Sequence, residues 1–181
     1  MIRLKSILTF FFILSFFIVA SISSKAQTYS VRNYLDEKRI VFGNKMVTLE
    51  LDYNNKANLS SIAINGQEVI HGESGLYSSI GTKAARFSTL KLAKSPSISI
   101  SNNIISVKNI QYGDNSVAIV ESWQFTITKD DIKLDIDRNI SKSITAEKVG
   151  FPVMNFSNMD IWEGAYQDYG GLAWFYLCNK K

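Results

Sequence analysis

The stretch "SVAIVESWQFTITKDDIKLDIDRNI", from Ser116 to Ile140, decides the fold of this chain. In its first half every second side chain is apolar or aromatic apart from one glutamate: Val117, Ile119, Glu121, Trp123, Phe125 and Ile127. In its second half the alternating set is Ile132, Leu134, Ile136, Arg138 and Ile140. A period of two places successive side chains on opposite faces of a strand. Asp130-Asp131 separates the two runs, so the stretch predicts a hairpin with one apolar face and one charged face.

The same alternation recurs on the N-terminal side of this hairpin. Residues 46–53 alternate in the same way, and Asn65-Gly66 is a strong signal for a two-residue hairpin turn. Asn102-Asn103 divides another pair of short strands, because asparagine tolerates left-handed backbone geometry. Helical periodicity is nearly absent. The pattern therefore predicts an all-β, antiparallel sandwich or barrel.

Two charged residues interrupt the apolar faces of the hairpin. Glu121 and Arg138 fall at matching depths on the two predicted strands. One interpretation is a structural ion pair across the strands at the edge of the core. The other is a polar floor beneath a sugar-facing surface.

The N-terminus has the three parts of a secretory signal peptide. Arg3 and Lys5 precede an apolar run from Ile7 to Ala20, and small residues at Ser24 and Ala26 form a cleavage site. The alternative is a transmembrane anchor, but the run is shorter than the ~20 residues that a spanning helix needs. We therefore expect residues 1–26 to be removed on export, with residues 27–181 forming one domain in the periplasm or outside the cell.

The composition of the exported part argues against several kinds of partner and binding site. The whole chain has a formal charge of +4, and the signal segment contains three cations and no acid, which leaves +1 after cleavage. We therefore expect no nucleic-acid partner. The chain has one histidine, His71, and one cysteine, Cys178. It can form no intrachain disulfide and no His/Cys metal site, and we expect no cofactor.

Several short motifs resemble the N-terminal β-supersandwich of secreted bacterial glycoside hydrolases, a domain of the galactose-mutarotase-like superfamily. They are "ESWQF" (121–125), "DIKLDIDRNI" (131–140), "WEGA" (162–165) and "GGLAWF" (170–175). The resemblance covers roughly Met46 to Leu177. It implies an all-β, antiparallel two-sheet supersandwich. The sequence leaves open whether further strands complete that sandwich on its C-terminal side.

The resemblance also implies a partner domain. In such enzymes an (α/α)6 barrel follows the sandwich and carries the catalytic carboxylates, and this chain stops at Lys181, before any such barrel. No catalytic residue can be carried over, because no position here matches one. We expect this fragment to have no hydrolytic activity of its own.

The C-terminal stretch "DIWEGAYQD" (160–168) has the composition of a sugar site. Aromatic rings lie against the C–H faces of sugars, and carboxylates accept hydrogen bonds from sugar hydroxyls. The predicted carbohydrate-binding residues are Trp162, Glu163, Tyr166 and Asp168. The following "GGLAWFYL" (170–177) is better explained as a turn and a core strand.

Two other candidates have simpler explanations. His71 precedes a glycine, which is typical of a turn; the alternative is a His–Glu pair with the nearby Glu73. Asp130-Asp131 and Asp135/Asp137 lack the offsets of an EF-hand calcium loop. We interpret them as a hairpin turn and a solvated strand face, and we expect no metal.

The sequence therefore predicts a carbohydrate-recognition or scaffold domain of an exported glycoside hydrolase. Its partners would be an oligo- or polysaccharide and the missing catalytic domain, with no membrane contact after cleavage. A free-standing secreted carbohydrate-binding module is one alternative. A structural or adhesion sandwich of the cell envelope, without sugar specificity, is another.

Overall fold

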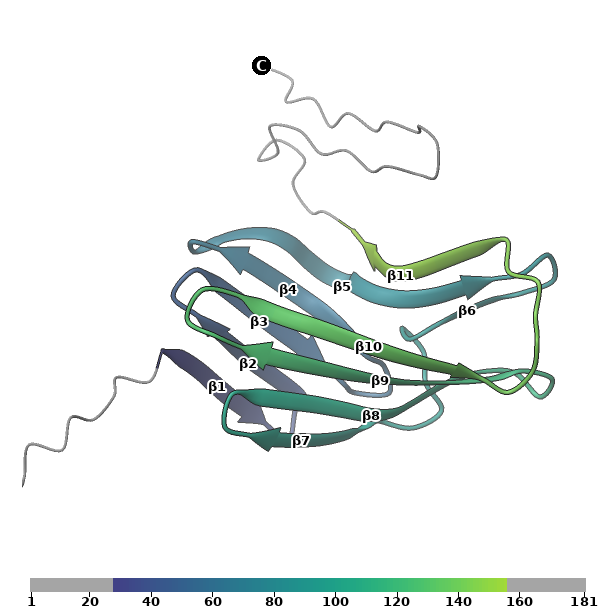
Figure 1. The fold of residues 1–181 in the computed structure, drawn as a ribbon, viewed down its shortest axis with the longest axis horizontal. Helices are drawn as coiled ribbons and strands as arrows, with labels where there is room; N and C mark the ends of the chain where they lie inside the picture. The colour runs from purple at the N-terminus through teal and green to yellow at the C-terminus, as the bar shows by residue number, and fades with distance from the viewer. Residues whose placement is uncertain (1–27, 156–181) are drawn as a thin grey trace, which may run out of the picture.

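The computed structural model describes residues 28–155, which form eleven β-strands and no helix (Figure 1). The strands build two antiparallel sheets that pack face to face. This confirms the predicted all-β, two-sheet antiparallel sandwich. The predicted signal peptide (1–26) and the C-terminal motifs lie outside the described residues.

The larger sheet has seven strands. Its order is β1-β2-β3-β4-β5-β11, and β6 pairs with β5 off this path. The strands are β1 (Tyr29–Tyr34), β2 (Arg39–Asn44), β3 (Val47–Asp52), β4 (Asn58–Ile64), β5 (Gln67–Gly81), β6 (Arg86–Ser88) and β11 (Lys148–Met154). At fifteen residues β5 is long enough to pair with three neighbours, one of which, β11, forms the edge of the sheet.

The smaller sheet has four strands in the order β10-β9-β8-β7. They are β7 (Ser97–Ser101), β8 (Ile104–Gly113), β9 (Ala118–Ile127) and β10 (Ile132–Ile140). The β9–β10 hairpin is the one predicted from residues 116–140, with Arg138 directly opposite Glu121. The apolar row of β9 is buried, and the outward Asp135 and Asp137 of β10 are exposed, as expected for a solvated face.

One hydrophobic core fills the space between the sheets. The larger sheet contributes Ile40, Phe42 and Leu51, and the smaller sheet contributes Trp123 and Phe125, all fully or almost fully buried. The rings of Phe42 and Phe125 meet edge-on across the interface, with centroids 4.9 Å apart. This contact joins the two sheets within the core.

The predicted turns are confirmed by the backbone. Asn65 and Gly66 have φ angles of 51° and 80°, the left-handed pair that a tight hairpin between β4 and β5 requires. Asn102 also has a positive φ of 51° between β7 and β8. Asp130-Asp131 lies in the turn from β9 to β10, where the Thr128 hydroxyl bonds to Asp131.

Other parts of the sheet were not predicted. Strands β1, β2 and β11 were not predicted from the sequence, and two of them, β1 and β11, form the edges of the larger sheet. The interpretation of His71 as a turn residue is wrong, because His71 lies inside β5, opposite Ser61. The irregularity that the following glycine signals is a bulge, in which residues 72–75 of β5 have no regular partners on β4.

Candidate functional site

The four predicted carbohydrate-binding residues, Trp162, Glu163, Tyr166 and Asp168, lie outside the described residues. Residues 28–155 include two polar features of different kinds. One is a buried network around Glu121, and the other is a hollow on the outer face of the larger sheet. They differ in how far solvent can reach them, so they can do different chemistry.

The buried network confirms the predicted cross-strand ion pair. Arg138 Nε donates to Glu121 Oε1 at 2.6 Å, and the glutamate side chain is fully buried. Tyr112 Oη donates to the same oxygen at 2.5 Å, and Trp123 Nε1 donates to Glu121 Oε2 at 2.7 Å. Arg138 Nη2 also donates to the Gly150 carbonyl of β11, 3.1 Å away. The network therefore joins three strands of the smaller sheet at the Glu121 carboxylate, and Arg138 links them to one strand of the larger sheet.

The electrostatics of the network favour a fixed protonation state. Burial raises the pKa of the Tyr112 hydroxyl well above its ordinary value, and the hydrogen bond to Glu121 raises it further. Tyr112 therefore stays a neutral donor throughout the physiological range. The Glu121 side chain is fully buried and already accepts three hydrogen bonds, so a sugar at the surface cannot reach it; the network is structural and not a floor beneath a bound sugar.

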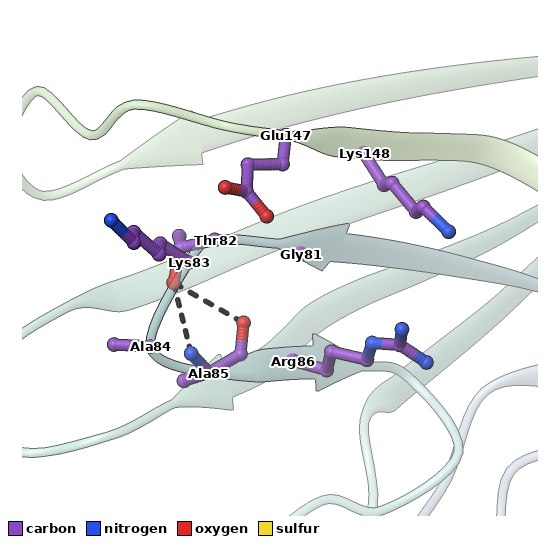
Figure 2. A pocket seen from close by; sticks show the side chains of 8 residues that line it. All are labelled: Gly81, Thr82, Lys83, Ala84, Ala85, Arg86, Glu147 and Lys148. Carbon is purple, nitrogen blue, oxygen red and sulfur yellow. Dashed lines mark hydrogen bonds between the residues drawn. The ribbon is translucent and has the colours of Figure 1, made fainter.

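The open feature is centred on Gly81, at the end of β5. Arg86 of β6 and Lys148 of β11 both lie directly opposite Gly81, one on each side. A Cβ atom added at Gly81 would lie 3.5 Å from Lys148 Cβ and 3.8 Å from Arg86 Cγ. Because glycine has no side chain, a hollow is left between the two cations. Figure 2 shows both side chains extending to the same side of Gly81.

The hollow continues in two directions along the sheet. Toward the β5–β6 turn it has a volume of about 310 Å³ and includes Lys83 and Glu147. There the Thr82 hydroxyl donates to the Ala85 carbonyl and accepts from the Ala85 amide, which holds the turn (Figure 2). Away from the turn, the hollow has a volume of about 230 Å³. Its lining there includes Leu90 and three residues with hydroxyl groups, Tyr77, Ser79 and Ser88.

The charge of this surface is positive. Three cations, Lys83, Arg86 and Lys148, and one carboxylate, that of Glu147, line the hollow near the turn (Figure 2). Within residues 28–155 neither Arg86 nor Lys148 forms an ion pair. We define the basic hollow as Tyr77, Ser79, Arg86, Ser88 and Lys148. It presents two cations that form no ion pair with the described part of the chain, together with hydroxyl groups and one aromatic ring.

The other candidates from the sequence do not form a site in this part of the chain. His71 Nδ1 lies 3.3 Å from Glu68 Oε1, so its acidic neighbour is Glu68 and not Glu73. Both side chains are exposed. Among the described residues no three His, Cys, Asp or Glu side chains gather as metal ligands, and no helix could span a membrane.

Comparison of the chain with protein-family models, with curated proteins and with solved structures finds no match. The basic hollow was also not found by sequence reasoning. Arg86 and Lys148 are 62 positions apart, and their proximity depends on the register of β6 and β11 on β5. The available signal was Gly81 at the end of an apolar strand, since a strand glycine often marks a place where other groups approach the backbone.

Proposed function

We propose that this protein is a carbohydrate-recognition domain of an exported glycoside hydrolase, and that the basic hollow contacts an acidic sugar. The observation that carries the proposal is the pair of cations, Arg86 and Lys148, on either side of Gly81, to neither of which a carboxylate of residues 28–155 is bound. Guanidinium and ammonium groups hold carboxylate or sulfate groups by charge-assisted hydrogen bonds.

The rest of the hollow suits a sugar ring. Tyr77 offers a ring for the C–H face of a sugar, and the Ser79 and Ser88 hydroxyls can exchange hydrogen bonds with sugar hydroxyls. The proposal for the parent enzyme rests on the resemblance to the galactose-mutarotase-like supersandwich. The observed two-sheet architecture is compatible with that resemblance, and the signal-peptide pattern supports export.

The test measures retention of the mature chain on affinity gels of an acidic polysaccharide and of its neutral, carboxyl-reduced form. We expect retention by the acidic gel, with affinity about tenfold or more weaker in an Arg86→Gln/Lys148→Gln variant. The matched control is Lys108→Gln/Lys129→Gln, which removes the same charge from exposed positions of the smaller sheet and its turn. It should bind like the wild type.

The outcomes separate the alternatives. Equal weakening by both double variants would mean that net charge, and not the hollow, binds the polymer. Loss of binding in Trp162→Ala, with none in the Arg86/Lys148 variant, would move the site to the C-terminal loop. No retention on any glycan would overturn sugar recognition and favour an envelope sandwich.

A further inference from the structure

An apolar groove opens along the border between the two sheets. Its volume is about 380 Å³. The larger sheet contributes Leu49, Leu59 and Leu76 among others, and the smaller sheet contributes Ile132, Leu134 and Ile136 of its edge strand β10. The groove is therefore continuous with the core, and nothing among residues 28–155 closes it.

The strands on the two sides of the groove are incompletely covered. The inward residues of β9 are buried, whereas those of β10 are all only partly buried. On the larger sheet, β11 places Val149 opposite Ile80 and Met154 opposite Leu76, so both side chains face the inner side. They are nevertheless 58% and 48% exposed. The inner face of the larger sheet thus extends beyond the smaller sheet, as Figure 1 shows for β5 and β11 above β10.

The edge of β10 is also open to a further strand. In the described part of the chain β10 pairs with β9 alone, and it has nine residues without a proline. Such an edge presents a row of unpaired amides and carbonyls. Its neighbouring groove supplies the apolar surface that a new strand would bury. An edge with these properties is a place where another strand adds.

We propose that residues 170–177 of this same chain, "GGLAWFYL", add as a strand to the edge of β10 and cover the groove. The chain reaches the groove at the end of β11, since Pro152 and Met154 line it. The fourteen residues from 156 to 169 can extend up to about 46–50 Å. That exceeds the ~30 Å length of the nine-residue strand β10. The linker therefore allows either strand direction.

The composition of the segment fits this position. Both alternating rows, Leu172/Trp174/Tyr176 and Ala173/Phe175/Leu177, are apolar or aromatic, so either face can cover the groove. A tethered segment also acts at an effective concentration in the millimolar range. It therefore outcompetes a second copy of the chain at ordinary protein concentrations.

The single cysteine provides a direct test. Cys178 follows the proposed strand, so a cysteine introduced at an end of β10 can be linked to it only if the Cα atoms come within about 7 Å. We expect Lys133→Cys or Asn139→Cys, whichever lies at the matching end, to form an intrachain disulfide under mild oxidation. The rate should exceed by at least about tenfold that of Ser99→Cys, which lies on β7, the other edge of the same sheet.

Equal rates in all three variants would overturn the proposal, because they would indicate an unattached tail. Disulfides formed only between chains would assign the groove to a second copy instead. A second measurement needs no cysteine. The full-length Trp174→Ser/Phe175→Ser variant should exchange the amide hydrogens of β10 at least about tenfold faster, whereas Trp162→Ser should not. Unchanged exchange in β10 would also overturn the proposal, and neither experiment depends on sugar binding.

Discussion

At the scale of single residues, the most consequential group is the Glu121 carboxylate. It is fully buried, and its oxygens accept hydrogen bonds from Tyr112, Trp123 and Arg138. A buried charge is tolerated only when paired and hydrogen-bonded, and here each donor comes from a position that faces the core. The Glu121 carboxylate specifies the register of β8, β9 and β10. A slip of β9 by one residue would turn this side chain to the outer face of the sheet, away from its three donors.

Glu121→Leu should lower the free energy of unfolding by about 3–5 kcal/mol, because it removes the carboxylate that pairs with the nearly buried Arg138. The double variant Glu121→Leu/Arg138→Leu should be more stable than Glu121→Leu, since the guanidinium that has lost this carboxylate is also gone. Urea unfolding followed by circular dichroism measures both. A double variant less stable than the single one would contradict the interpretation of the pair as structural.

At the scale of elements, β5 has most of the structural features that the local sequence pattern did not predict. The turn predicted at His71 would interrupt this segment, but the structure has one long strand with a bulge at residues 72–75. The buried Asn58 side chain of β4 donates to the carbonyls of Glu73 and Ser74, which replaces ladder bonds lost in the bulge. Beyond the bulge, β5 reaches Gly81 and there aligns β6 and β11, which creates the basic hollow.

Gly75→Ala should be markedly more destabilising than Gly66→Ala. Both glycines have a positive φ, so alanine at either position lowers the free energy of unfolding by about 1–2 kcal/mol because of the left-handed backbone. At Gly75 the new methyl group would also collide with the Leu59 carbonyl, whereas at Gly66 nothing lies within 4 Å. We expect a loss of about 2–5 kcal/mol for Gly75→Ala in urea unfolding. Equal losses at the two sites would contradict the close approach of β4 and β5.

At the scale of the whole molecule, the two sheets share one core and should unfold together. One direct contact between them is the edge-on pair of Phe42 and Phe125, which belong to different sheets. The pair lies in the same core cluster as Trp123 and Leu51, so a substitution in one sheet alters the packing of the other. The apolar groove at the border shows where this core continues past the edge of the smaller sheet.

The variants Phe42→Leu and Phe125→Leu should therefore be coupled. A double-mutant cycle is expected to give an interaction energy of about 0.5–1.5 kcal/mol, the range for aromatic pairs. As a control, Phe42→Leu with Ile70→Val should be additive, because Ile70 is buried in the larger sheet but outside the shared core cluster. Additivity of the two phenylalanine changes, measured by thermal or urea unfolding, would contradict a single cooperative core.

The sequence by itself determined the all-β class, the β9–β10 hairpin with its Glu121–Arg138 pair, and the turns at Asn65-Gly66 and Asn102-Asn103. These features depend on neighbours in the chain, so periodicity and turn preferences suffice to predict them. Only the tertiary structure decided that β5 is one bulged strand, that Arg86 and Lys148 meet across Gly81, and that the core is open beside β10. Those features depend on pairings between distant segments, whose register is set by packing of the whole core and not by any local pattern.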